Sequence, residues 1–309
     1  MKTLLLLVEI CMVMTVTAFA IENEQGFQIV PMLQHESLIL ESQGITSNGM
    51  GLIMMGEDLI FVGSYTHHTL KESPSFNYPD EYHSFDMMVE KEDGENQLLM
   101  VFKSDSDEPA LDRLNTYQAA MLYGFGLVKR DHLEIILGGG LAVGDFGIEA
   151  SNGDPWPVIP VPFFRFKVNS HWIDCSFDFI TGPSLDLVFF PQSKLQVAGE
   201  MRMDQFRDDR DVLAEAAIRY RFFNQDQTED DFAGVALGIK NDNYGAFGLH
   251  RSYEESLEIH YKTIFAELDL SLIKITGGHA FHGRELYGEE IKHELGSGNY
   301  LSVQMMYQF

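Results

Sequence analysis

The feature that most constrains the fold is an alternation of apolar and polar residues that continues through long segments of the chain. It is clearest in KLQVAGEMRMDQF (194–206), DVLAEAAIRYRFF (211–223), HWIDCSFDFI (171–180) and SLEIHYKTIF (256–265). A period of two is typical of a β-strand with one apolar face, and helical periodicity is hard to find in the chain. The segments therefore predict an all-β protein with unusually long strands.

Short polar connectors such as KRDH (129–132), TGPS (181–184) and NDN (241–243) separate these segments. They are too short for parallel crossovers and indicate antiparallel hairpins. From residue 115 onward we expect strands at 115–128, 132–144, 159–168, 171–181, 184–190, 194–206, 211–223, 231–240, 243–250, 256–266, 268–276 and 299–309. Weaker candidates lie at 36–45, 50–63, 83–91 and 95–103. The prediction is an antiparallel transmembrane up-and-down β-barrel of about 14 strands, with roughly 12 to 16 allowed.

The first 20 residues resemble a secretory signal peptide. MKTLLLLVEICMVMTVTAFA combines one lysine, an apolar run and an Ala-Phe-Ala end, so we expect cleavage after Ala20. A membrane anchor is the alternative, although the run is short for a spanning helix. Residues 21–309 then form a single domain. After cleavage only Cys175 remains, which excludes an intramolecular disulfide and favours a fold held by extensive strand pairing.

The chain is strongly acidic, with 47 Asp and Glu against 21 Lys and Arg and a formal net charge of −26. This charge argues against nucleic acid as a partner. It allows a cation-preferring interior or acidic loops that bind divalent ions. It is equally compatible with an exterior that only keeps the protein from aggregating.

The polar rows carry charges of both signs at consecutive positions of one strand face. A soluble β-sandwich also alternates, but its strands are shorter and its outer face carries scattered polar residues. In a barrel the charged rows would face the lumen, and the apolar rows would face lipid with aromatic residues such as Phe179, Tyr220 and Phe222 near the headgroups. The predicted lumen-facing charges are Arg165, Lys167, Asp174, Asp178, Glu200, Arg202, Asp204, Glu215, Arg219 and Arg221, with Asp186, Glu258 and Lys262 in the same rows.

The last residues, NYLSVQMMYQF (299–309), alternate in the same way and end on an aromatic residue. The segment resembles the C-terminal β-signal of Gram-negative-type outer-membrane β-barrel proteins, in which the barrel-assembly machinery recognises the last strand. The matching positions are Leu301, Val303, Met305, Tyr307 and Phe309. The resemblance implies a bacterial outer-membrane protein whose last strand closes the barrel against the first. A soluble strand that happens to end in Phe is the alternative.

A second resemblance covers about residues 115–223. The order of GGGLAVGDFG, PVPFFRFKVNSHW and SLDLVFF, followed by long alternating strands, is similar to an outer-membrane barrel family of unassigned function. It implies a fold and a location but no activity. The glycines at 138–140 lack the lysine of a phosphate-binding loop, and we expect them to mark strand curvature or close approach.

No catalytic residue, metal site or cofactor can be assigned from motifs. His279 and His282 are weak metal candidates, because Gly-flanked residues between strands do not fix two side chains on one face. His67 and His68 are adjacent and should point to opposite faces. A lipid-cleaving enzyme would need a Ser–His pair with an acidic or amide partner, but Ser256 and His260 lie about 13 Å apart along one strand.

These observations predict an outer-membrane barrel with periplasmic termini, whose partners are membrane lipids and the assembly machinery. The leading function is a passive or weakly selective pore for small solutes, or a structural surface barrel. The alternatives are an outer-membrane lipid hydrolase or acyltransferase, and a soluble periplasmic lipid-binding barrel. Residues 277–298 and 224–231 are expected as extracellular loops, and the Pro-rich loop at 151–160 falls on the periplasmic side. The sequence leaves the oligomeric state open.

Overall fold

The computed structural model is a closed β-barrel of 16 antiparallel strands, which confirms the predicted all-β up-and-down architecture. The structure describes residues 28–41, 43–71, 80–106, 117–144, 157–179, 182–203, 212–222, 233–246, 257–287 and 290–307. The predicted signal peptide and Phe309 lie outside these residues. In the described part of the chain, no helix has the length and apolar character that a membrane span requires.

Each strand pairs with its neighbours in sequence, and β1 pairs with β16 to close the barrel. Closure leaves no free sheet edge, so every strand has a hydrogen-bonding partner on both sides. The strands are β1 (Gln28–Leu40), β2 (Gly44–Met55), β3 (Leu59–Lys71), β4 (Glu81–Asp93), β5 (Asn96–Ser106), β6 (Gln118–Arg130), β7 (Leu133–Gly144), β8 (Val158–Asn169), β9 (Ile173–Phe179), β10 (Pro183–Phe189), β11 (Leu195–Met203), β12 (Val212–Arg221), β13 (Ala233–Ala246), β14 (Leu257–Leu270), β15 (Ile273–Tyr287) and β16 (Glu290–Met306).

The estimate of about 14 strands was slightly low because the N-terminal third holds five strands. The predicted strands at 36–45 and 50–63 each cross a turn of the structure, at 41–43 and at 56–58. Gly56 marks the second turn, where its N–H donates to the carbonyl oxygen of Leu59 at 2.7 Å. The apolar residues on both sides of each turn made two strands look like one.

The opposite error occurred at NDN (241–243), which was predicted as a turn and lies inside β13. The Asn241 side chain makes two hydrogen bonds to the backbone of β12 in place of hydrogen bonds to water. Its Oδ1 accepts from the Ala214 N–H at 2.6 Å, and its Nδ2 donates to the Val212 carbonyl at 2.6 Å. Asp242 pairs with Lys240 at 2.9 Å. Bonds to β12 and within β13 therefore satisfy side chains that usually mark a turn.

The predicted strands 231–240 and 243–250 thus overlap a single strand, β13. With one strand fewer, each connector that precedes β13 moves to the rim opposite the predicted one. The rim that holds the start of β1 and the end of β16 carries the connectors 56–58, 94–95, 131–132, 170–172, 190–194, 222–232 and 271–272. The opposite rim carries 41–43, 72–80, 107–117, 145–157, 180–182, 204–211, 247–256 and 288–289. The Pro-rich segment thus joins strands at the rim away from the termini, and 224–231 at the terminal rim, both opposite to expectation.

Residues 277–298 also differ from the prediction, since nearly all of them are strand. They belong to β15 and β16, which pair with register shifts between Ala280 and Gly283 and between Glu285 and Leu286. His282, with a φ of 53°, lies in the first irregularity. β-Bulges of this kind disrupt the alternation, so the sequence pattern there looks like a loop.

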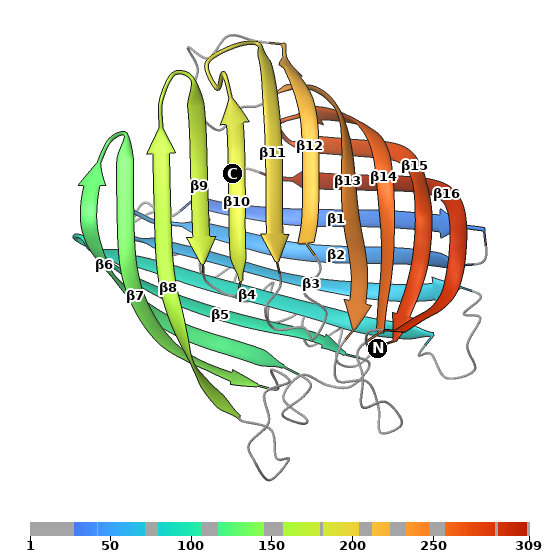
Figure 1. Ribbon diagram of the computed structural model, residues 1–309, viewed down its shortest axis with the longest axis horizontal. Coiled ribbons are helices and arrows are strands. Elements are labelled where there is room, and N and C mark those ends of the chain that lie inside the picture. The colour runs from blue at the N-terminus through green and yellow to red at the C-terminus, as the bar shows by residue number, and fades with distance from the viewer. Residues whose placement is uncertain are drawn as a thin grey trace.

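The barrel is flattened rather than round. In Figure 1, β1–β5 run across the back of β8–β13 at a steep angle, and β6 and β7 curve between the two layers. Cα atoms of β5 and β13, which are eight strands apart in a ring of sixteen, approach within 8 Å. Opposite walls therefore touch, and side chains fill part of the interior.

Glycines allow the bend at β6 and β7. A Cβ on Gly138 would lie 2.0 Å from the carbonyl oxygen of Tyr123, and one on Gly140 would lie 1.9 Å from that of Met121. No side chain fits at either position. The run GGG thus marks a close approach of two backbones.

Candidate functional site

Contacts between non-neighbouring strands identify the face of each strand that points into the lumen. Tyr244 on β13 donates a hydrogen bond to Glu36 on β1, and Arg165 on β8 contacts Glu90 on β4. Each pair is separated by three intervening strands, so it can meet only across the interior. The strand registers extend this assignment to the other strands, because directly paired residues share a face.

Arg165 is a buried cation in the lumen. Its Nη1 lies 2.9 Å from Glu90 Oε1, and its Nε lies 2.6 Å from Asp178 Oδ1. The side chain of Gln97 also donates to Glu90, and the guanidinium lies 5.9 Å from the centroid of the Phe163 ring. The group therefore ties β4, β5, β8 and β9 together through one cation with two carboxylates.

Registers place the other predicted lumen charges on this inner face. They are Lys167, Asp174, Asp186, Glu200, Arg202, Glu215, Arg219 and Arg221. Asp204 lies outside the described residues. Several are partly exposed and loosely paired, with Arg219 3.7 Å from Glu215 and Arg202 4.0 Å from Asp242. Such exposed pairs contribute little to stability and are compatible with a hydrated space.

Glu258 and Lys262 were expected in the same rows, but they lie on the outer face of β14. Their neighbours Ile259, Tyr261 and Phe265 are buried inside. Tyr261 stacks on Tyr244 at 5.6 Å, within an apolar cluster that fills this side of the interior. The apolar row was assigned to lipid because alternation shows that two faces differ and does not show which one points inward.

A second inner cluster forms around a buried histidine. His68 Nδ1 lies 2.8 Å from Ser47 Oγ, its Nε2 lies 2.9 Å from Ser84 Oγ, and its ring stacks on Tyr82 at 4.3 Å. Both ring nitrogens are occupied by hydroxyls, and the side chain is 8% exposed. We regard this cluster as structural, because Ser47, His68 and Ser84 are all buried and a substrate cannot reach either hydroxyl.

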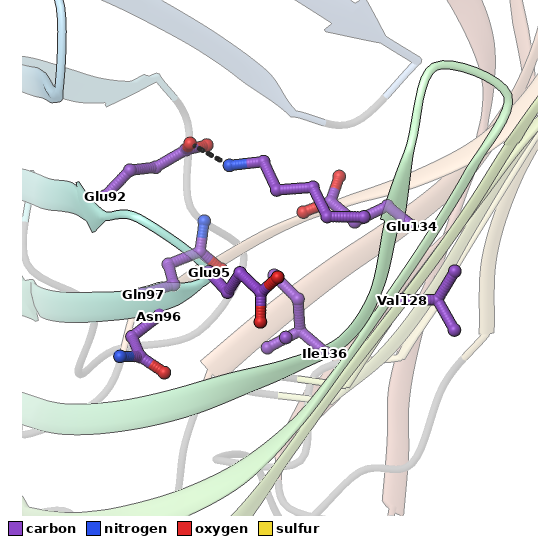
Figure 2. Close-up of a pocket in the computed structure, with 9 residues that line it drawn as sticks. Glu92, Glu95, Asn96, Gln97, Val128, Glu134 and Ile136 are labelled. Atoms are coloured by element: carbon purple, nitrogen blue, oxygen red, sulfur yellow. Dashed lines mark hydrogen bonds and ion pairs between the residues drawn. The ribbon is translucent and has the colours of Figure 1, made fainter.

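A small pocket lies between β4, β5, β6 and β7 near the terminal rim. Figure 2 shows Glu92, Asn96, Gln97 and Glu134 around it, and its empty volume is about 220 Å³. Lys129 Nζ closes one side through an ion pair of 2.5 Å with Glu92. The space is a shallow gap between side chains at the rim.

The outer face is apolar over most strands. Its exposed residues include Leu33, Ile39, Met121, Tyr123, Phe125, Leu127, Leu137, Leu141, Leu195, Val197, Ile218, Tyr220, Leu237, Ile239, Ile264, Leu268, Leu301, Met305 and Tyr307. Leu301, Val303 and Met305, three positions of the β-signal pattern, lie on this face in β16, and Tyr307 follows the strand.

Polar residues interrupt the outer face on β1–β4. His35 Nδ1 lies 2.8 Å from Asn48 Oδ1. Asn48 pairs in register with His67, and His67 with His83, so these four residues form one row across four strands. His67 also lies 3.1 Å from Glu81. His67 and His68 thus point to opposite faces, as adjacent strand residues must.

The metal candidates do not form a site. His279 pairs with Asn299 on the outer face of β15 and β16, while His282 lies in the bulge. Among the described residues, no group of three His, Cys, Asp or Glu side chains could hold a metal ion. Ser256 lies outside the described residues, and His260 is paired with Glu258 at 2.5 Å.

The sequence did not reveal the His35–Asn48 pair. His35 preceded the predicted strand at 36–45, and Asn48 fell between two predicted strands. A turn placed at 41–43 would have paired His35 with Asn48 across the hairpin. The sequence feature that could have indicated the pair is therefore His-x-Ser at 35–37 followed by Asn48.

No protein-family model matches the chain, and no curated protein matches its sequence. Solved structures with a similar strand arrangement include the FrpB iron transporter from Neisseria meningitidis (9% identity, 90% of this chain and 60% of that chain, TM-score 0.36). BamA from Haemophilus ducreyi aligns at 6% identity over 92% of this chain and 71% of that chain, with a TM-score of 0.29. OmpT of Vibrio cholerae aligns at 10% identity over 92% of this chain and 97% of that chain, with a TM-score of 0.30.

These neighbours are outer-membrane β-barrels, and this chain spans about 60% of the length of FrpB. Their TM-scores are low, so the class of the protein rests on its own geometry. That class is the closed antiparallel up-and-down β-barrel with an apolar outer face.

Proposed function

We propose that the protein is an outer-membrane β-barrel with both termini in the periplasm. The apolar outer face supports this location, since side chains such as Leu237, 67% exposed, would be costly in water and favourable in lipid. A soluble periplasmic lipid-binding barrel would instead place its apolar residues inside.

The two rims support the same orientation. All but one of the connectors at the terminal rim have five residues or fewer, the exception being 222–232, and the opposite rim holds the segments 72–80, 107–117, 145–157 and 247–256. Short periplasmic turns and longer extracellular loops are typical of outer-membrane barrels. The partners of this barrel are then outer-membrane lipids and, for its insertion, the barrel-assembly machinery, with Phe309 as part of the signal.

The function that the geometry supports best is that of a barrel acting through its wall and surface. One observation carries this proposal: the walls β5 and β13 approach within 8 Å, so the lumen is not an open tube. The side chain of Arg165 and two buried apolar clusters also occupy the interior. A ring of 16 strands could enclose an aqueous channel only if it were rounder.

Two measurements test this proposal. Outer-membrane extracts should contain the protein as a heat-modifiable band, and purified protein should give no stable steps of porin size in planar bilayers. Recovery of the protein entirely as a soluble periplasmic species would refute the location. Large, long-lived conductance steps would refute the closed lumen.

A narrow, weakly selective passage is the second candidate. Asp186 and Glu200 are exposed on the inner face, which indicates room for water beside β10 and β11. Such a passage would give small cation-preferring steps that Glu200→Gln weakens. The same bilayer recordings therefore separate the two candidates.

A further inference from the structure

The outer wall carries a group of polar side chains on β1 and β2 that the closed lumen does not explain. His35 and Ser37 alternate with inward-facing residues on β1, so both point outward. On the same strand face, Leu33 precedes them and Ile39 follows them, with exposures of 52% and 59%. Along its own strand, the polar pair is thus flanked by residues suited to lipid. Polar groups in that setting cost free energy, so their presence indicates a functional site.

The hydrogen bond of His35 fixes its chemistry. Asn48 Oδ1 accepts from the Nδ1–H at 2.8 Å, which assigns the proton to Nδ1 and leaves Nε2 as the basic nitrogen. An amide or carboxylate bound to Nδ1 is the arrangement that prepares a histidine to take a proton from a nucleophile. The buried His68 differs, because hydroxyls occupy both of its nitrogens.

Ser37 is the hydroxyl residue that follows His35 on the outer face of β1. It lies two residues from His35 on the same face, about 6.7 Å along the strand, which the two side chains together can span. Catalytic hydrogen bonds of this kind are often longer before substrate binds. Thr46 pairs directly with Ser37 in register, so its hydroxyl lies on the same face opposite the reacting serine.

We propose that Ser37, His35 and Asn48 form a lipid-facing serine hydrolase site that cleaves acyl esters of membrane lipids. The proposal rests on the outer-membrane location. The site lies in the half of β1 nearer Leu40, at the rim opposite the termini, so its substrates come from the outer leaflet. Ser37 and His35 are the catalytic residues, Asn48 positions His35, and Thr46 donates to the oxyanion.

The reaction needs no cofactor. Ser37 Oγ attacks the ester carbonyl carbon and its proton passes to His35 Nε2, giving a tetrahedral oxyanion. The oxyanion collapses, the bond from carbon to the alcohol oxygen breaks, and His35 returns the proton to the departing alcohol. Water then loses a proton to His35 and attacks the acyl-serine. The second oxyanion collapses, the bond from the acyl carbon to Ser37 Oγ breaks, and His35 returns its proton to Oγ as the fatty acid leaves.

The test uses the full-length mature barrel inserted in vesicles, with heat-modifiable migration as the measure of folding. One set of vesicles contains phosphatidylethanolamine and phosphatidylglycerol, and a second set also contains lipid A, so the released fatty acids identify the source of the ester. A fluorophosphonate probe reports a reactive serine independently of turnover. Ser47→Ala is the matched control, since Ser47 lies next to Thr46 on β2 but faces the lumen.

We expect fatty-acid release that falls about 1000-fold or more in Ser37→Ala and His35→Ala, with loss of probe labelling at Ser37. Asn48→Ala should lower the rate about tenfold or more, and Asn48→Asp should restore part of it, because a carboxylate can accept the same hydrogen bond. Recovery by the aspartate variant separates positioning of His35 from a merely structural role. Ser47→Ala should retain both signals.

A heat-modifiable barrel that neither releases fatty acids nor reacts with the probe would overturn the hydrolase and leave the outer-membrane proposal standing. Equal activity in Ser37→Ala would also overturn it. A chain that does not insert into membranes would overturn both proposals. These outcomes are distinguishable on the same samples.

Discussion

The buried ion pairs of Arg165 allow a quantitative prediction. We consider Arg165→Met, which keeps much of the side-chain volume and removes the charge. The Arg165 side chain is 7% exposed, and those of Glu90 and Asp178 are 13% and 17% exposed. The variant therefore leaves two nearly buried carboxylates without their cation, and loss of one partner from such a group costs about 3–5 kcal/mol.

Urea unfolding of the barrel in lipid vesicles, followed by heat-modifiable migration, measures this cost as a change in the free energy of unfolding. Lys129→Met provides the control, because its pair with Glu92 is also short, at 2.5 Å, but both side chains are 44% exposed. It should cost no more than about 1 kcal/mol.

Adding Glu90→Gln and Asp178→Asn to Arg165→Met should recover much of the lost stability, since the unpaired charges are then gone. A loss below about 1 kcal/mol for Arg165→Met alone would contradict this reasoning. So would a triple variant less stable than the single one.

Three further predictions concern assembly and the wall. Deletion of Phe309 should lower the amount of protein in the outer membrane while leaving the unfolding of refolded barrel unchanged, and normal membrane levels would contradict this. Gly140→Val should prevent folding, because its Cβ would lie 1.9 Å from a carbonyl oxygen, whereas Gly277→Ala should fold normally since a Cβ there meets nothing within 4 Å; refolding yield in detergent compares them. Leu237→Arg should destabilise the inserted barrel by roughly 2–4 kcal/mol if this position lies near the bilayer midplane, and Leu237→Ile, as control, should cost far less.

Much of the fold could be predicted from alternation alone. The segments around β8–β12 alternate cleanly because their inner rows carry charges such as Glu200 and Arg219, while their outer rows carry residues such as Val197 and Ile218. Because the two faces meet chemically different environments, the residue type at each position indicates whether its side chain points inward or outward. The alternation therefore predicts strands and an antiparallel barrel, whereas the exact strand number depends on where the turns fall.

The rest depends on contacts that no local pattern shows. β14 places Tyr261 and Phe265 inside, where each belongs to a buried apolar cluster. At this part of the barrel the inner face is therefore apolar, and a polar row no longer marks the lumen. Asn241 looked like a turn residue because its partners lie on β12, 27 residues away. Flattening of the barrel follows from the packing of β5 against β13, which are far apart in sequence and have no motif in common.

The candidate site was missed for a related reason. An amide that orients a histidine across a hairpin becomes visible only when the register is known, and a shift of one residue would turn Asn48 to the other face. Ser256 and His260 were the serine and histidine that the sequence pattern brought together. The structure instead places His35 beside an amide, Asn48, on the first hairpin.

The unequal lengths of the strands have a consequence for the membrane around the barrel. β9 and β10 have 7 residues each, whereas β14, β15 and β16 have 14, 15 and 17. At a tilt of about 40°, a strand of seven residues rises roughly 18 Å, less than the apolar band of about 25 Å in such barrels. In the proposed outer-membrane location, lipids beside β9 and β10 would thin to match the wall, while those beside β14–β16 would not need to. A barrel placed there would impose a gradient of bilayer thickness around its circumference, with the thinnest lipid beside the strands that lie opposite β1 and β2 in the ring.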